Sequence, residues 1–582
     1  MKNRKICWRL ALCSLLWMFS AHAEQPGAKY LKLYETIQPS GVTPFGENVN
    51  LYTGELNFQQ TDIELAGQGP TIVLGRDYSD PSILTLADWS LTIPRIEVMV
   101  KTPGRRVTGT PGENWKTAYY PVANGLPVAS EARCTHFGMP YDPYEDWIWW
   151  QRGYELTTER GERHQLLKRS AQNMAAPNYL NSNGMPMSFP VVTQQNWQIG
   201  CLPKTSNGQI GEAFLAISPD GNRYYFDHLV GVRTTDYLEH DMGEIIYHGR
   251  MLAVMYVSKI EDRFGNFINY RYTDDKLVAI ESSDGRAVAV NWQADGIHRI
   301  ESIVVQPGTQ NARTWQYRYG SYGLAEVVLP DLSKWTFVLT AGYQPPSITN
   351  TCGTRSVQSV VGPEVDLTIS SPTGAIGVFT LSAANHARSY VPSDCRTSSD
   401  GSYAEDIFPI FGTSSLVRRQ IKGPGLPTRI WNYIYSPAIG STTKDACALS
   451  NSCVDRRWVD VIDPEGNRSR YSLSTRWGVL EGKMIGREDY KAGVAAVERL
   501  EALEYAPYNG GPYPLSLGGG YGDWRSNTIK SEVWSPLSKR VITQQGVAFK
   551  WEVATGCSGG SGLCFDTFAR PIKVIKSSSP SP

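Results

Sequence analysis

Five segments of the chain repeat one plan: an apolar strand, a turn made of Pro, Asp or Gly, and a second strand that carries an aromatic residue. Asp and Pro initiate tight turns and Gly accepts the positive φ that ends them, so the spacing has a mechanical reason. A hairpin of this kind cannot bury its apolar face alone and must stack on its neighbours. The sequence therefore predicts an extended series of paired hairpins. The five segments are residues 214–229, 258–280, 325–338, 366–381 and 459–485.

Between the turns, apolar residues alternate with polar ones instead of recurring at helical spacing. Residues 267–292 show this most clearly, because three successive runs each place apolar side chains on one face. Alternation punctuated by Gly, Pro, Asn and Asp predicts an all-β protein of many short antiparallel strands. The three sets are Ile268, Tyr270 and Tyr272, then Val278 and Ile280, then Val288, Val290 and Trp292.

Two stretches depart from this pattern. Residues 489–508 carry apolar residues at helical spacing between strand-like flanks, so this segment is ambiguous between helix and strand. The closing residues 576–582, KSSSPSP, are of low complexity and are predicted to be disordered.

The first residues have the pattern of a cleaved secretory signal peptide. A basic start is followed by an apolar run from Leu10 to Phe19 and by small residues at Ala21 and Ala23. The run is about half of the roughly 20 residues that span a bilayer, so cleavage after Ala23 is favoured over an uncleaved anchor. We expect an exported protein that is secreted, surface-bound or periplasmic, with no membrane span after signal cleavage.

Eight cysteines remain after the signal, and an even number in an exported chain predicts disulfides. Pairing by proximity joins 134 with 201, 352 with 395, 447 with 453, and 557 with 564, but the sequence leaves the connectivity open. A metal site is less favoured, because the chain has no CxxC pair and no His at ligand spacing. The eight are Cys134, Cys201, Cys352, Cys395, Cys447, Cys453, Cys557 and Cys564.

The charge balance excludes a nucleic-acid partner. The chain has 56 basic and 56 acidic residues, and four of the basic ones lie in the signal, so the mature net charge is about −4. Neither a phosphate-binding loop nor a dinucleotide fingerprint occurs, and no cofactor is predicted.

The repeated turns resemble the RHS/YD-repeat family, in which a DxxGN or PDGN turn precedes a YxYD strand. The match is closest at Asp262, Gly265, Asn266, Tyr270 and Tyr272. Residues 219–227 are similar to this unit, and so is a second DxxGN turn, which holds Asp463, Gly466 and Asn467. Residues 565–574 look like the start of another unit.

The segment from Val49 to Asp80, with Trp89 and Ser90, is similar to the opening of these proteins, although Asp88 stands where Gly is usual. The resemblance implies a coiled antiparallel β-ribbon of YD-type hairpins that forms part of a shell, with an N-terminal β domain. In full-length family members the shell encloses a C-terminal toxin, whose self-cleavage segment has no counterpart here after residue 570. A downstream toxin or C-terminal shell component is therefore a possible partner.

The predicted organisation has five parts: a signal peptide at 1–23, an N-terminal RHS-type β domain at 24–130, a Trp-rich insertion at 131–209, a repeat region at 210–564, and a partial repeat with a disordered tail at 565–582.

The Trp-rich insertion holds the best candidate for ligand binding. Trp147, Trp149 and Trp150 lie beside Asp142 and Glu145. Aromatic rings stack on sugars, although packing is their more common role, and a carboxylate pair among rings is what a glycosidase needs. These tryptophans are candidate carbohydrate-binding residues, and a cell-surface glycan is the partner that they imply.

Two motifs for other chemistry are weaker. The stretch from Gly556 to Gly560 has the letters of a hydrolase GxSxG elbow, but the last His, His386, precedes it, so a glycine-rich disulfide loop is favoured. His240 and His248 flank two carboxylates without any metal-ligand spacing, which favours a surface loop.

These observations predict a non-enzymatic, exported RHS/YD-repeat protein that acts as a structural shell or delivery scaffold in cell contact or toxin systems. The alternative is a secreted carbohydrate-binding or adhesive protein. A secreted hydrolase, using Ser558 or the carboxylates at 142 and 145, is the weakest reading.

Overall fold

The structure is a computed structural model of the whole chain. It describes residues 43–101, 133–135, 154–169, 178–180, 184–339, 356–357, 363–397, 403–404, 409–507, 522–523, 528–529, 535–557 and 562–580, with gaps at 79–85, 87, 210, 234–236, 242–243, 249, 295–297, 392, 394–395 and 479.

The described residues confirm the all-β class. Their strand ladders are antiparallel, and the helix seen in this part of the chain, α2 (Ala446–Leu449), is a single turn. Among the same residues, no helix has the length and apolar character needed to cross a membrane.

The N-terminal segment forms a separate four-stranded sheet. Its strands pair in the order β1, β2, β3, β4, each antiparallel to the next. They are β1 (Glu47–Val49), β2 (Leu56–Leu65), β3 (Ile72–Asp77) and β4 (Ser90–Leu91).

The next strands belong to the main sheet, and the described part of residues 131–209 is included in it. β5 pairs with β6, and β6 with β7; β8 pairs with β9, and the ladders continue through β10 and β11 to β12. The strands are β5 (Arg95–Lys101), β6 (Glu155–Thr157), β7 (Arg163–Gln165), β8 (Leu167–Lys168), β9 (Val191–Val192), β10 (Gln198–Leu202), β11 (Ala213–Ile217) and β12 (Arg223–Arg233).

β15 (Arg250–Glu261) is a branch point of the main sheet. One edge pairs along its length with β12. The other edge is divided: Arg250–Tyr256 pairs with β5, and Lys259–Glu261 pairs with β16. Two parts of the sheet therefore grow from one strand.

From β15 onward the strands form a ribbon in which each one pairs with the next. Its first half consists of β16 (Phe267–Thr273), β17 (Lys276–Ser282), β18 (Ala287–Trp292), β19 (Ile300–Val305), β20 (Arg313–Gly320), β21 (Gly323–Val328), β22 (Lys334–Leu339), β24 (Val365–Ser370) and β25 (Ile376–Ala387).

The second half continues in the same way to the last strand. It consists of β28 (Ile410–Gly423), β29 (Leu426–Tyr435), β31 (Arg456–Ile462), β32 (Arg468–Ser474), β33 (Met484–Tyr490), β34 (Arg499–Tyr505), β37 (Leu537–Gln544), β38 (Val547–Val553) and β39 (Val574–Pro580).

Four short pairs lie outside the main sheet. They are β13 (Tyr237–Asp241) with β14 (Glu244–His248), β23 (Ser356–Val357) with β30 (Ala438–Ile439), β26 (Arg396–Thr397) with β27 (Tyr403–Ala404), and β35 (Gly522–Asp523) with β36 (Thr528–Ile529).

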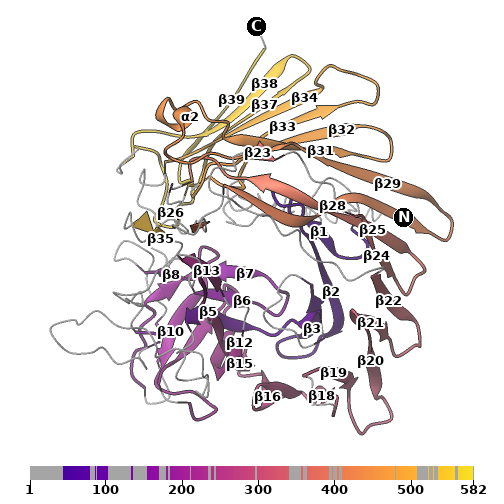
Figure 1. Cartoon of the computed structure of the whole chain (residues 1–582). Coiled ribbons are helices and arrows are strands. Elements are labelled where there is room, and N and C mark those ends of the chain that lie inside the picture. Colours follow the sequence, from indigo (N-terminus) through magenta and orange to yellow (C-terminus); the bar gives the residue numbers. More distant parts are fainter. Residues whose placement is uncertain are drawn as a thin grey trace, which may run out of the picture.

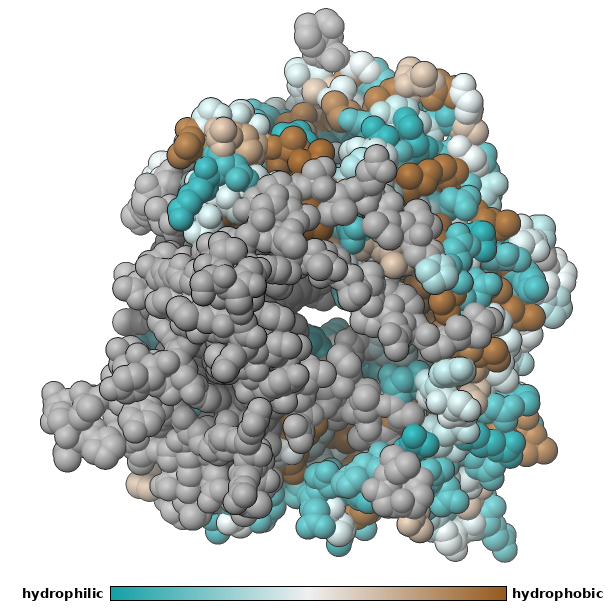
Figure 2. Space-filling view, in the orientation of Figure 1, coloured by the Kyte–Doolittle hydropathy of each residue, from teal (hydrophilic) through white to brown (hydrophobic). Residues whose placement is uncertain are grey.

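The ribbon follows an arc, and the N-terminal sheet lies on its inner side (Figure 1). Aromatic contacts join the two: Phe58 meets Phe379 of β25 with ring centroids 5.0 Å apart, and Trp89 meets Phe337 of β22 at 5.1 Å. Phe45 also contacts Phe379, at 6.0 Å. On the face shown in Figure 2, hydrophilic and hydrophobic residues are interspersed over the described surface. One core cluster therefore contains side chains of the N-terminal sheet and of the ribbon, together with side chains of strands β5–β15.

One prediction about the C-terminus is wrong. The tail from residue 576 was predicted to be disordered, but residues 574–580 form β39, which pairs with β38 over seven positions from Val547↔Pro580 to Val553↔Val574. Backbone hydrogen bonds on the edge of β38 are available to almost any sequence, so a Ser-rich segment extends the sheet despite its low strand propensity.

The segment with mixed periodicity is a hairpin. Residues 491–498 connect β33 to β34, and Glu488↔Leu500 is one of the pairs between them. Strand pairing on both sides outweighs the helical spacing of the apolar residues. Val494 and Val497, which belong to that spacing, are exposed in the connection and contribute no buried helix face.

Candidate functional site

The DxxGN turn is held together by its first side chain. Asp262 Oδ1 accepts hydrogen bonds from the backbone N–H of Phe264 at 2.8 Å and of Asn266 at 2.9 Å. The Asn266 amide donates to the other oxygen at 2.8 Å, and this bond is the main reason that the pKa of Asp262 lies below its usual value. Gly265 has φ +88°, which explains the glycine.

The second predicted copy has the same geometry. Asp463 accepts from the N–H groups of Glu465 and Asn467 at 3.0 and 2.8 Å, and Asn467 Nδ2 donates to its second oxygen at 2.9 Å. Gly466 has φ +84°. The spacing of the motif is thus the spacing of one hydrogen-bonded turn.

The same five-residue turn recurs through the described chain. In each copy the first N–H donates to the fifth carbonyl, the fourth N–H donates to the first carbonyl, and the fourth residue has positive φ. Several copies form the connection between two consecutive strands of the ribbon. The copies are 158–162, 193–197, 218–222, 262–266, 282–286, 329–333, 371–375, 463–467 and 566–570.

The two tyrosines of YxY have different roles. The Tyr272 hydroxyl donates to the Val257 carbonyl at 2.7 Å, beside an irregularity in the ladder that leaves Val278 of β17 without a pair. Tyr270 is 4% exposed, and its hydroxyl has no hydrogen-bond partner among the described residues. Tyr270 therefore contributes packing, whereas Tyr272 also locks two strands together.

A bond of the same kind, from an aromatic side chain to a backbone carbonyl, recurs along the ribbon at strand ends; the donor is the indole N–H in Trp292 and a hydroxyl in the three tyrosines. Each donor lies on a strand that follows its acceptor by 15 to 21 residues, at distances of 2.6 to 2.8 Å. The pairs are Trp292 with Leu277, Tyr319 with Ile300, Tyr435 with Leu416, and Tyr505 with Met484.

The repeat turns also bind the N-terminal sheet. The loop after β2 lies against turn 282–286, where Asp284 accepts from the Gln68 N–H at 2.9 Å and Arg286 donates to the Pro70 carbonyl at 3.0 Å. A Cβ on Gly67 would lie 2.2 Å from Asp284 Oδ2, so a side chain at this position would displace Asp284 or Arg286. The hydrogen bond from Arg286 is the main cause that lowers the pKa of Asp284.

A buried ion pair within the N-terminal sheet is contacted by a tyrosine of the ribbon. Arg76 of β3 donates from Nε to Asp62 at 2.7 Å, and the Tyr317 hydroxyl of β20 donates to the same oxygen at 3.0 Å. The Arg76 guanidinium also lies 5.3 Å from the ring centroids of Trp89 and Phe337. Sequence reasoning did not single out this contact, because its residues are far apart in the chain.

A second buried network involves the last histidine, His386, which is 0% exposed. Its Nδ1 faces the guanidinium of Arg457, which only donates, so Nδ1 accepts and Nε2 carries the proton. Nε2 then donates to Thr413 at 2.6 Å and to Ser415 at 3.0 Å, and both hydroxyls donate to the Thr53 carbonyl.

The direction of these bonds decides what the network can do. A histidine that acts as a general base must accept the proton of its serine, but His386 Nε2 donates toward Ser415. Burial, followed by the charge of Arg457, lowers the pKa of His386 well below its usual value and keeps it neutral. The network therefore anchors residue 53 to the ribbon and is not arranged for nucleophilic catalysis.

The last repeat turn returns to the beginning of the main sheet. Phe568, which is 1% exposed, packs with Ala569 against Leu167 of β8 and Val192 of β9. Gln194 Nε2 donates to the Phe568 carbonyl at 3.0 Å. We call this contact the seam; it is completed by Arg570 Nη1, which donates to Asn196 Oδ1 at 3.3 Å.

Three predicted disulfides are present: Cys134–Cys201, Cys447–Cys453 and Cys557–Cys564. The fourth pair, Cys352 with Cys395, lies outside the described residues. Cys557–Cys564 lies directly before the seam turn. The GxSxG letters therefore begin a disulfide loop, as favoured from the sequence. Ser558 itself is outside the described residues.

The remaining predicted sites are placed as follows. Trp147, Trp149 and Trp150, with Asp142 and Glu145, lie outside the described residues. His240 and His248 belong to the β13–β14 hairpin, where they pair with Ile245 and Tyr237. Within the described part of the chain, no group of three or more His, Cys, Asp or Glu side chains is placed to hold a metal.

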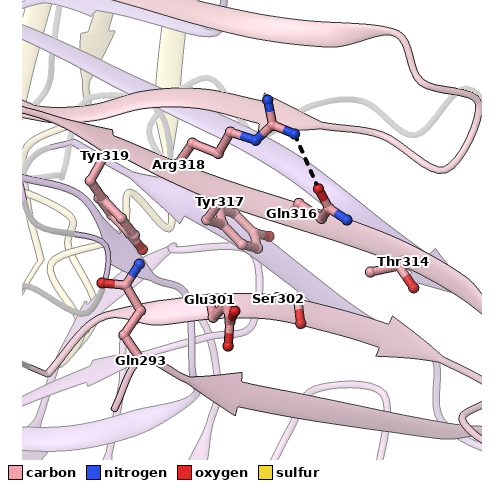
Figure 3. A pocket seen from close by; sticks show the side chains of 8 residues that line it. All are labelled: Gln293, Glu301, Ser302, Thr314, Gln316, Tyr317, Arg318 and Tyr319. Carbon is pink, nitrogen blue, oxygen red and sulfur yellow. Dashed lines mark hydrogen bonds between the residues drawn. The ribbon is translucent and has the colours of Figure 1, made fainter. Parts of the chain in front are cut away.

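A shallow polar cavity of about 450 Å³ lies over β18–β20 (Figure 3). Gln293 points toward Tyr319, Glu301 and Ser302 come from the neighbouring strand, and Arg318 donates to Gln316 at 3.4 Å. Amide, hydroxyl and guanidinium groups of this kind are able to bind a polar ligand by hydrogen bonds. Its lining contains one carboxylate, so it lacks the carboxylate pair of a glycosidase.

Comparison with known proteins does not extend this description: no protein-family model and no curated protein sequence matches the chain.

Proposed function

We propose that the protein is an exported shell or delivery scaffold, in which the hairpin ribbon wraps round an enclosed space in the manner of RHS/YD-repeat proteins. A structural role fits the way that the recurrent features are used. The repeat turns shape the hairpins, the second tyrosine of YxY locks neighbouring strands, and the buried charges attach the N-terminal sheet.

The seam carries this proposal. Phe568 and Asn196 belong to segments 372 residues apart at opposite ends of the sheet, yet turn 566–570 donates from Arg570 to Asn196. A ribbon that only stacked hairpins in a line would keep its ends apart. Contact between the ends supports a wall that returns on itself.

The inner N-terminal sheet supports the same reading. It is attached to the ribbon through Arg76, Asp62 and Tyr317, and through Thr53 near His386. These contacts are fully or largely buried, so the sheet is an integral part of the wall and not a loosely tethered domain.

The proposal is tested by electron cryo-microscopy of the oxidised mature protein. An enclosed, ribbon-walled particle is expected, and separate globular domains without a continuous wall would overturn the proposal. Phe568→Asp should open the particle at the seam. The matched control is Phe264→Asp, because Phe264 holds the same position in its own turn but is 76% exposed.

The delivery role has its own test. Co-expression with the protein encoded by the adjacent reading frame should give a complex in which that protein resists added protease. Equal digestion with and without the shell would argue against an enclosed cargo. Glycan binding without any enclosed particle would favour the adhesive alternative instead.

A further inference from the structure

We propose that the seam is under redox control: the Cys557–Cys564 disulfide holds the closing turn in place, and reduction of this disulfide by a dithiol opens the wall. The inference rests on the proposed function, because opening has a consequence only if the wall encloses something. It identifies the condition under which the enclosed space becomes accessible.

The seam is a small contact compared with the rest of the core. Its apolar part consists of the four buried residues Leu167, Val192, Phe568 and Ala569. Hydrogen bonds from Gln194 and Arg570 complete it. Contacts with so few buried groups are the first to open in local fluctuations, so their stability depends on how well each partner is positioned beforehand.

The disulfide positions one of the two partners. Cys564 is 0% exposed and lies in a second apolar cluster beside Phe565, next to the first residue of the turn. Its N–H donates to the Ala554 carbonyl at 2.9 Å, and its carbonyl accepts from the Ile572 N–H at 2.9 Å. The backbone on both sides of turn 566–570 is therefore fixed at Cys564.

The covalent link restricts how far this anchor can move. Cys557 and Cys564 are seven residues apart, and their bond closes a loop directly before the turn. Closing a loop removes disordered alternatives of the segment, and cutting the bond restores them. Phe565 and Phe568, which follow Cys564 by one and four residues, then lose this constraint.

The two cysteines differ in exposure, and this difference selects Cys557 as the one that a reductant attacks. Cys557 is partly exposed and follows the exposed Thr555 and Gly556, whereas Cys564 is buried. A thiolate of the reductant attacks the Cys557 sulfur and releases Cys564 as a thiolate, which takes up a proton. The second thiol of the reductant then displaces Cys557, so that one protein disulfide becomes two thiols and the dithiol becomes a disulfide.

This arrangement predicts that the wall stays closed under oxidising conditions and opens under reducing ones. Oxidising conditions outside the cell keep the disulfide and the seam intact. A reducing compartment, entered after delivery, supplies the dithiol that loosens the turn.

Hydrogen exchange measured by mass spectrometry on the full oxidised chain tests the proposal, with dithiothreitol as the reductant. We expect amides in 565–573 and 191–197 to exchange at least tenfold faster after reduction. The variant Cys557→Ser/Cys564→Ser should show the faster exchange without reductant. The control Cys447→Ser/Cys453→Ser removes a disulfide elsewhere and should match the wild type.

Unchanged exchange at both seam segments after reduction would overturn the proposal, and so would an equal increase in the control variant. If the Cys557/Cys564 variant does not fold, the wild type decides: seam exchange must accelerate at the rate at which thiol labelling of Cys557 appears. Protection in β16–β18 reports whether the fold persists. Failure of the enclosed wall itself would be seen separately, in images of the oxidised protein.

Discussion

The carboxylate of Asp88 accepts a hydrogen bond from the backbone N–H of Leu324 at 2.7 Å, across 236 residues of sequence. The acceptor lies in the N-terminal segment just before Trp89, and the donor lies at the start of β21 in the ribbon. Asp88 thus has a defined structural role, because its side chain fixes the hairpin between β20 and β21.

Replacing Asp88 with alanine should destabilise the fold. The Leu324 N–H loses its acceptor, which costs about 1 to 3 kcal/mol of unfolding free energy when the group stays buried. Asp88→Asn keeps an acceptor oxygen and should cost less. Denaturant unfolding of the two variants measures the difference, and equal losses would show that the hydrogen bond is not the cause.

The two tyrosines of the YxY unit should respond differently to loss of their hydroxyls. Tyr272→Phe removes the bond to the Val257 carbonyl and should cost about 1 kcal/mol. Tyr270→Phe removes a buried hydroxyl that has no partner among the described residues, so it should be neutral or stabilising. Thermal unfolding distinguishes the pair, and a larger loss at Tyr270 would contradict the assignment.

The turn glycine should be sensitive to its backbone angle alone. At Gly265 an added Cβ meets nothing within 4 Å, but φ is +88°. Gly265→Ala should therefore cost about 1 to 2 kcal/mol through strain. Gly265→Asn should cost less, since Asn tolerates this region better. Equal unfolding free energies for wild type and the alanine variant would rule out strain.

His386 should make stability depend on pH. Burial, then Arg457, lowers its pKa, so below pH of about 6.5 the unfolded chain binds this proton more readily than the folded protein. Its stabilisation is fully present above that pH and is lost as the pH falls, by at most about 1.4 kcal/mol per pH unit.

Unfolding measured between pH 7.5 and 5.5 tests this assignment. His386→Gln should weaken the pH dependence relative to the wild type. His298→Gln is the control, because the His298 side chain is 56% exposed. A pH dependence that survives in His386→Gln would assign the titration to another group.

Local patterns predicted the elements of this fold better than their details. Turn residues and alternation gave the all-β class and the positions of the turns at 262–266 and 463–467. Alternation also predicted that Val278 and Ile280 share one face of their strand, but in the structure Leu277 and Ile280 are the buried pair. The irregularity at Val278 shifts the period by one residue, and it depends on a neighbouring strand that a local pattern does not include.

Contacts between distant segments could not be predicted in this way. Three disulfides join the cysteines that proximity in sequence predicted: two close short loops of 6 and 7 residues, which are easy to form, and Cys134–Cys201 spans 67 residues. The bond between His386 and Arg457 and the seam at Phe568 join segments with no shared local signal. Phe264 and Phe568 occupy the same position in equivalent turns, yet one is exposed and the other buried, so only the tertiary context separates them.

From the divided edge of β15 we expect the ribbon to depend on strands that precede it in the chain. Seven residues of that edge pair with β5, which precedes it in the chain, and three pair with β16, which follows it. β16 pairs with β15, and the other two neighbours of β15, β5 and β12, are synthesised before it. Deletion of residues 95–101 would leave the backbone N–H and C=O groups of Arg250–Tyr256 unpaired on an exposed strand edge. We expect such a protein to aggregate before its ribbon is complete.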